Sequence, residues 1–198
     1  MASSVSPTIV NVGYRSTNFW VVSAGQNRLL VDLGWPGKSA TLLANLERMG
    51  VPLGEIRYGL ATHYHIDHAG AAEDLKRKGM KLLVMQEQVH AIPLMKQWTK
   101  PADTYTEITN SGNIVTPCAE SRALLATIGI EGEIVHTPGH SDDSVSLVLD
   151  TGCAFTGDLT LPAMVATEDA DVVASSWRRL RDMGVTTIYP GHGSSYSL

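Results

Sequence analysis

Metal-ligand residue types are concentrated in one short stretch of this sequence. Three histidines and an aspartate fall within six positions, directly after an apolar, strand-like run over Ile56–Ala61: His63, His65, Asp67 and His68. Such side chains crowded into one turn repel one another or lack partners unless a cation binds them together. Imidazole and carboxylate groups are ligands that borderline divalent metals prefer. The stretch therefore predicts a metal-binding loop.

The spacing within this loop predicts two directions of ligation. His63 and His65 are two residues apart, so in extended backbone both rings project to the same side. Asp67 and His68 follow after the chain has begun to turn, so they can point elsewhere. This favours two ligands for one ion and two for its neighbour, and the plainer alternative is a surface turn that happens to be rich in histidine.

Three further residues of the same chemistry stand where a predicted strand ends beside a glycine: His140, Asp158 and His192. The glycine lets the backbone approach closely or take positive φ, so that the side chain can point inward. Each one alone has a plainer explanation as a turn or cap residue, but together with the loop they provide two nearly complete ligand shells. His90 and His136 lack this setting, and we expect structural roles for them.

Composition limits the class of protein. The chain has 198 residues, enough for one domain with a sizeable core, with 43% hydrophobic and 18% charged residues, as in soluble globular proteins. Its net charge is −5 and its longest basic run is Lys76-Arg77-Lys78, which argues against a nucleic-acid or anionic-membrane partner. We expect a small-molecule substrate, and the oligomeric state stays open, a dimer included.

The cysteines and the N-terminus indicate the compartment. Cys118 and Cys153 cannot build a disulfide framework, and two buried thiols in a reducing compartment are the expected account. The N-terminus lacks a basic start and an apolar signal core, and no window approaches the ~18–20 apolar residues of a membrane span. These features predict a cytoplasmic protein.

Strand-like and helix-like segments share the chain, and strand ends carry the candidate ligands. Strands are expected over Thr8–Val12, Asn18–Ser23, Arg28–Val31, Ile56–Ala61, Met80–Met85, Glu133–Thr137, Ser144–Leu149, Cys153–Thr156 and Thr186–Tyr189. Helices are expected over Lys38–Met49, Gly70–Lys78, Ala119–Thr127 and Asp169–Met183.

The pattern loosens around residues 86–116, where Gln86–Gln97 could be helical despite Pro93. We expect a lid or irregular loop there, within a single domain over residues 1–198. Apolar residues of this region either line the mouth of a site or form core beneath the loop: Met85, Leu94, Met95 and Trp98.

Five motifs together resemble the metallo-β-lactamase superfamily of metallohydrolases over nearly the whole chain. They are Val31-Asp32-Leu33-Gly34, His63-x-His65-x-Asp67-His68, Thr137-Pro138-Gly139-His140-Ser141, Thr156-Gly157-Asp158 and Pro190-Gly191-His192-Gly193. A lone His-x-His would be weak evidence, whereas five motifs in the family's order and spacing are strong.

The resemblance implies an α/β fold, a four-layer αββα sandwich with a dinuclear metal site at the edge of two central sheets. It implies a first metal held by His63, His65 and His140, and a second held by Asp67, His68 and His192. Asp158 would bridge the two ions. Asp32 would lie behind the ligands and steady the loop.

The implied activity is hydrolysis by a metal-bridging hydroxide, because two divalent ions ~3.5–4 Å apart can lower the pKa of a shared water from ~16 to roughly 7. Asp67 is the carboxylate expected to orient the nucleophile and carry its proton. Zinc is the first choice of ion, with Mn, Fe or Co as alternatives. The alternative activities within the fold are a mononuclear iron oxidoreductase, similar to the persulfide dioxygenases, and a phosphodiesterase.

Departures from particular family members restrict the substrate. True β-lactamases characteristically lack the bridging aspartate that Asp158 would supply. The chain is similar to glyoxalase II in its ligands but lacks that enzyme's Gly-Arg segment after the bridge, and only Gly193–Leu198 follow His192, without the helical domain that grips glutathione. It is similar to acyl-homoserine lactonases but has Leu161 where they carry a tyrosine, so any catalytic phenol would come from Tyr64 or Tyr189.

The residues beside the bridge predict the character of the substrate. Leu161, Pro162 and Met164 suggest an apolar wall beside Asp158. The sequence thus favours a small, partly apolar ester, thioester or lactone as substrate.

Overall fold

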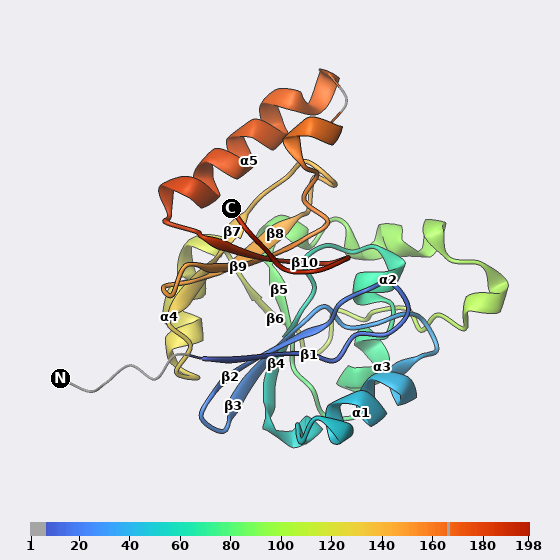
Figure 1. The fold of residues 1–198 in the computed structure, drawn as a ribbon. Coiled ribbons are helices and arrows are strands. Elements are labelled where there is room, and N and C mark those ends of the chain that lie inside the picture. Colours follow the sequence, from blue (N-terminus) through green and yellow to red (C-terminus); the bar gives the residue numbers. More distant parts are fainter. Residues whose placement is uncertain (1–6, 166) are drawn as a thin grey trace.

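Two mixed β-sheets form the centre of the molecule, and this computed structural model describes residues 7–165 and 167–198 (Figure 1). In spatial order the first sheet contains β1 (Thr8–Asn11), β2 (Trp20–Ala24), β3 (Asn27–Val31), β4 (Ile56–Leu60), β5 (Leu82–Met85) and β6 (Ile114–Thr116). The second contains β11 (Tyr196–Ser197), β10 (Thr187–Pro190), β9 (Cys153–Gly157), β8 (Val145–Leu149) and β7 (Gly132–His136).

Within the described residues, five α-helices and several short 3₁₀ helices complete the fold. The α-helices are α1 (Ser39–Arg48), α2 (Ile66–Ala69), α3 (Ala72–Lys76), α4 (Ser121–Ala126) and α5 (Ala170–Asp182). The 3₁₀ helices are η1 (Leu53–Glu55), η2 (Gln86–Gln88), η3 (Ile92–Trp98), η4 (Pro101–Asp103), η5 (Cys118–Glu120), η6 (Pro162–Met164) and η7 (Thr167–Asp169). In the described part of the chain, no helix has both the length and the apolar character needed to span a membrane.

Successive side chains along each strand point to opposite faces of the sheet, so the apolar core is divided into three clusters. In the first sheet, Val21 points to the cluster beneath α1 and α3, whereas its neighbour Val22 points to the cluster between the sheets. In the second sheet, Phe155 faces the other sheet and Ala154 faces the cluster under α5. Helices therefore cover both outer faces of the paired sheets, as Figure 1 shows, and the four-layer αββα sandwich predicted from the sequence is confirmed.

The direction of the strands brings the candidate ligands to one edge. Strand β3 runs parallel to β4, and β9 runs parallel to β10, so each pair ends on the same side. Asp32 follows β3 directly, and Asp158 and His192 follow β9 and β10 within two residues. The loop after β4 contributes the remaining cluster, which begins at His63.

The helix predicted over Gly70–Lys78 differs from the observed structure. It is divided into α2 and α3, and α2 begins at Ile66, within the histidine loop. At Gly70 the backbone lies so close to Pro36 and the Ile66 carbonyl that any Cβ would collide with both. Gly70 is therefore a point of close packing and not the start of the helix.

The segment 86–116 is more ordered than its sequence pattern suggested. It contains η2, η3, η4 and the three-residue edge strand β6, which was not predicted, while the helix expected over Gln86–Gln97 is divided into η2 and η3. Met85 and Met95 are fully buried in the core, whereas Leu94 and Trp98 are exposed. Met85 and Met95 are therefore core beneath the segment, and Trp98, whose ring centroid is 6.1 Å from that of His65, lies beside the candidate ligands.

Candidate metal centre

The first group of candidate ligands consists of three histidine rings. His63 and His65 come from the loop after β4, and His140 from the loop after β7. The ring centroid of His63 lies 4.5 Å from that of His65 and 4.8 Å from that of His140, and His65 Nδ1 is 3.1 Å from His140 Nε2. One ligand atom from each ring lies within 4.8 Å of the others, so the group could hold an ion.

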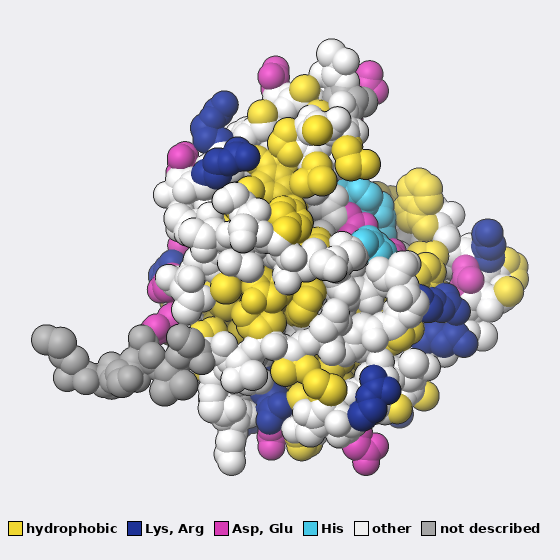
Figure 2. Space-filling view, in the orientation of Figure 1, with side chains coloured by type: hydrophobic (Ala, Val, Ile, Leu, Met, Phe, Trp, Pro, Cys, Tyr) yellow, Lys and Arg dark blue, Asp and Glu magenta, His cyan; other side chains and the backbone are white. Residues whose placement is uncertain are grey.

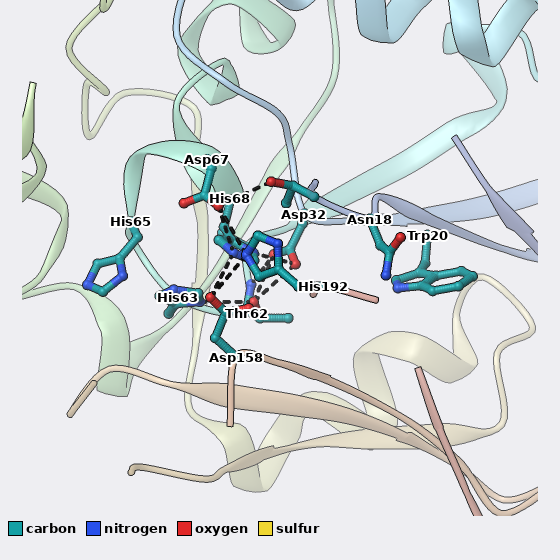
Figure 3. Close-up of polar contacts among 12 residues, drawn as sticks. Asn18, Trp20, Asp32, Thr62, His63, His65, Asp67, His68, Asp158 and His192 are labelled. Atoms are coloured by element: carbon teal, nitrogen blue, oxygen red, sulfur yellow. Dashed lines mark hydrogen bonds and ion pairs between the residues drawn. The ribbon is translucent and has the colours of Figure 1, made fainter. Parts of the chain in front are cut away.

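The second group lies beside the first and combines Asp67, His68 and His192. The Oδ2 atom of Asp67 is 3.4 Å from His68 Nε2 and 3.3 Å from His192 Nε2. His68 is fully buried on α2, whereas His192 is exposed at the end of β10. Figure 3 shows these side chains pointing toward one another, Asp67 and His68 from α2 and His192 from the loop after β10.

Asp158 lies between the two groups. Its Oδ2 atom is 3.4 Å from His68 Nε2, 3.3 Å from His192 Nε2 and 3.8 Å from His140 Nε2. With His63 and His68 it forms a third, overlapping group of possible ligands. The structure thus brings all seven residues predicted from the sequence into one cluster, with Asp158 in the position that a bridge would occupy.

Unpaired buried atoms show that this donor set fits a metal. His63 Nε2 and Asp158 Oδ1 are buried in the described structure without a hydrogen-bond partner there, and His68 Nε2 has only the Oδ2 atoms of Asp67 and Asp158 at 3.4 Å. The opposite nitrogen of His68 is 2.8 Å from Asp32, and that of His63 is 3.2 Å from the Thr62 hydroxyl. Buried polar atoms are rarely left unpaired, and a cation shared by these atoms would satisfy all of them.

The electrostatics also favour positive charge at this point. Burial lowers the pKa of His63 well below its usual value, so the ring is neutral, the form that binds metal. Burial alone would lower the pKa of His68, but the charge of Asp32 and the hydrogen bonds to Asp158 and Asp32 raise it well above its usual value. A proton or a metal ion can supply the positive charge that these carboxylates favour.

Burial and charge act in opposite directions on the carboxylates. Burial alone would raise the pKa of Asp67 and of Asp158, but the hydrogen bond and the positive charge of His68 hold both below their usual range. Both side chains are therefore ionised at neutral pH, as metal ligands must be.

Several supporting residues were not predicted from the sequence. The Thr17 hydroxyl donates to Asp67 Oδ2 at 3.1 Å and accepts from Trp35 Nε1 at 3.2 Å. The Ser16 carbonyl accepts from His192 Nδ1 at 2.7 Å, which leaves Nε2 facing the cluster. Ser16 and Thr17 lie in a loop of ordinary turn composition far from the motifs, so no local signal could have identified them.

A second buried network holds the histidine loop from behind. Asp143 accepts from the Tyr64 amide at 2.8 Å, and the buried Gln88 donates to the carbonyls of Ala61 and Thr62. Gly191 is also constrained, because a Cβ there would collide with Asp158 and His68. Asp143 and Gln88 therefore hold the backbone of the histidine loop, and Gly191 allows the close approach of the last ligand loop to it.

The remaining sequence candidates lie outside the cluster. The Tyr64 ring is buried in the core and burial raises its pKa, while Tyr189 stacks on Phe155, so neither is placed to supply a catalytic phenol. His90 pairs with Asp142, and His136 lies 2.6 Å from the Asp142 carbonyl. Neither histidine belongs to the ligand groups found among the described residues.

A hollow gives access to the cluster from solvent. Figure 2 shows histidine and acidic side chains at its floor, with hydrophobic side chains on both sides. On the side of the second sheet is a pocket of about 390 Å³, termed here the side pocket, whose apolar wall includes Leu159, Leu161, Met164, Pro190 and Tyr196. Of the apolar wall residues predicted from the sequence, Leu161 and Met164 line this pocket.

Comparison with known proteins establishes the family. The sequence model described as "Metallo-beta-lactamase superfamily" matches residues 12–192, so the chain belongs to this superfamily. The chain is similar to "Beta-lactamase-like protein 2 homolog" of Drosophila melanogaster, with 30% identity over 91% of this chain and 59% of that protein. It is also similar to "Atrochrysone carboxyl ACP thioesterase" of Claviceps purpurea, with 31% identity over 91% of this chain and 52% of that protein.

Solved structures agree with the fold. A metallo-beta-lactamase family protein from Thermus thermophilus superimposes with a TM-score of 0.69 at 17% identity, over 97% of this chain and 75% of that chain. The chain spans between half and three fifths of the length of the two curated relatives named above.

Proposed function

We propose that this chain is a metal-dependent hydrolase that cleaves a thioester or a related small ester at a centre of two divalent ions. The observation that carries the proposal is the convergence of seven ligand-type side chains, among which His63 Nε2 and Asp158 Oδ1 are buried without a hydrogen-bond partner in the described structure. The first ion would be held by His63, His65 and His140, the second by Asp67, His68 and His192, with Asp158 shared.

The chemistry that this centre would supply, when loaded, is a water of lowered pKa and polarisation of the substrate carbonyl. Asp67 is ionised and its Oδ2 accepts from Thr17, so it is held in a fixed orientation from which it can accept a proton. Thr17 and Trp35 would act as positioning residues for this carboxylate.

The substrate class rests on relatives and on the pocket. Relatives at 28–31% identity carry the names atrochrysone carboxyl ACP thioesterase and thioesterase pkgB, which favours a thioester. The apolar side pocket next to Asp158 suits an uncharged substrate better than a nucleic-acid phosphodiester. Zinc suits the nitrogen and oxygen donors, and Mn, Fe or Co would also be accepted by them.

The test is elemental analysis of the purified protein together with a panel of chromogenic thioester, lactone, phosphodiester and β-lactam substrates. We expect about two ions per chain and turnover of the thioester. His65→Ala and Asp158→Ala should lose both metal and turnover, whereas His90→Ala, which removes an exposed histidine outside the cluster, should keep both.

Two results would overturn the proposal. Full activity and full metal content in either ligand variant would refute the assignment of the centre. One iron per chain with consumption of oxygen would instead favour the oxidoreductase of this fold.

A further inference from the structure

The side pocket shares its wall with the metal centre. His140, Asp158 and His192 line it together with the apolar residues, so a group seated there would lie directly beside the reacting atoms. Its volume of about 390 Å³ is within the range of small-molecule sites. It is therefore a candidate subsite for one half of the substrate.

The charge of the lining indicates which half. The described lining of the side pocket contains no lysine, arginine or glutamate, and its only aspartate and histidines are the three that belong to the candidate metal centre. The Thr160 hydroxyl is occupied, because it donates to the Gly139 carbonyl at 3.2 Å. No cationic side chain of this lining is available for a phosphate or carboxylate, so the pocket suits the uncharged acyl half of a thioester and not an anionic leaving group.

The wall has a fixed base and an exposed tip. Leu159 is buried against the α5 layer, and the Trp177 indole donates to the Thr160 carbonyl at 2.8 Å, which anchors the chain as it enters η6. At the other end, Leu161 and Met164 are 42% and 76% exposed. Exposed large apolar side chains beside a site carry a hydrophobic cost that an apolar ligand would remove.

The opposite side of the centre is also apolar. Trp98, at the end of η3, is 62% exposed, and its ring centroid lies 6.1 Å from that of His65. Figure 2 shows hydrophobic side chains flanking the histidines on both sides of the hollow. A substrate that crosses the centre would therefore leave the side pocket and pass the indole of Trp98 on its way to solvent.

We propose that the side pocket binds the acyl group of the substrate and selects an apolar chain several methylenes long, with Leu161 and Met164 as specificity-determining residues. This inference rests on the proposed thioesterase function. The thiol half of the substrate then extends past Trp98.

The test is a series of straight-chain acyl thioesters of one thiol, from acetyl to decanoyl, assayed with the zinc-loaded enzyme. Burial of each methylene gives a rise in kcat/KM of up to about fourfold until the pocket is filled. Met164→Ala should lower kcat/KM for octanoyl substrate about fivefold or more and change it less than twofold for acetyl. Leu161→Trp should fill the pocket and move the preference toward acetyl.

Met49→Ala is the matched control, because Met49 is 47% exposed at the end of α1 and lies outside the side-pocket lining. A second readout is binding of the free carboxylic acids by calorimetry, which does not depend on turnover. Octanoate should bind the wild-type protein and the Met49→Ala variant more tightly than the Met164→Ala variant.

The outcomes separate the two proposals. Absence of hydrolysis of every thioester, with two ions bound, would refute the proposed function. Hydrolysis with no dependence on chain length, or with the same dependence in the Met164→Ala and Leu161→Trp variants, would refute the acyl pocket and leave the hydrolase in place.

Discussion

Asp32 is a tightly constrained residue behind the candidate metal centre. It is 1% exposed and has a φ of 65°, in the left-handed region that non-glycine residues rarely occupy. Its carboxylate is 2.8 Å from His68 Nδ1 and accepts from both the amide and the hydroxyl of Thr62. The hydrogen bonds of Asp32 therefore offset the cost of its strained backbone. They orient the His68 ring and fix Thr62, which follows β4.

The variant Asp32→Asn tests this role. Asparagine tolerates positive φ and keeps the shape, but it loses the charge that fixes the His68 tautomer with Nε2 toward the cluster. We expect zinc affinity to fall about 10–100-fold, measured by competition with a chromophoric chelator. Asp142→Asn, at an 84% exposed carboxylate, is the control and should bind zinc as the wild type does. Equal affinity in both variants would contradict the role.

Residues of this centre differ in how far the sequence could predict them. His63 and His68 stand in a dense local motif, so their chemistry is evident from spacing alone. Thr17 and Asp143 form their bonds to residues 50 and 79 positions away, and nothing in their own neighbourhood distinguishes them from turn residues. Partners of this kind depend on the tertiary fold, which local pattern does not encode.

At the scale of elements, α3 anchors the long segment that follows β5. Glu73 accepts from the Thr109 amide at 3.0 Å, the Lys76 ammonium donates to the Thr109 carbonyl at 2.7 Å, and Thr106 donates to Asp74 at 2.8 Å.

The main α-helices and most strands were predicted because their apolar pattern extends over enough residues to be recognised. Strand β6 was not, since three residues at a sheet edge carry too little periodicity to detect.

This anchor should depend on pH. Burial alone would raise the pKa of Glu73, but the Thr109 amide and Lys76 outweigh burial and hold it below the usual 4.5. A carboxyl group whose pKa is lower in the folded protein than in the unfolded chain contributes to stability. That contribution is fully present above the pKa of the unfolded chain and is lost as the pH falls through the pKa of the folded protein. Glu73→Gln should therefore lower the free energy of unfolding by about 1.5–3 kcal/mol near pH 7, and this difference should shrink as the pH falls below the usual pKa of 4.5.

Urea unfolding of both proteins in chelator, at several pH values, measures this difference without a contribution from metal. Glu107→Gln removes an exposed ion pair with Lys96 and is the control, with an expected change of about 0–1 kcal/mol at every pH. A Glu73→Gln effect that did not change with pH would show that the carboxylate contributes no charge-dependent stability.

At the scale of the whole molecule, the centre joins the two halves of the sandwich. Four candidate ligands follow β4 of the first sheet, and three come from loops of the second: His140, Asp158 and His192. The N-terminal loop adds direct links between the halves. The side chain of Asn18 donates to the carbonyls of Pro190 and Gly193, and its backbone N–H donates to the Gly191 carbonyl. An ion bound to ligands of both sheets would therefore connect the two sheets at the edge where these loops meet.

Metal binding should then stabilise the fold as a whole. An ion that binds only the folded state adds about 2.7 kcal/mol at a free concentration 100 times its Kd. Zinc at such a concentration should raise the free energy of unfolding by at least this amount, measured by denaturant titration, and chelator should reverse the increase. His140→Ala removes a ligand of the second half and should lose much of the increase at the same zinc concentration, while His90→Ala should keep it. If His140→Ala gained as much from zinc as the wild type, His140 would not hold an ion, and this link between the two sheets would be refuted.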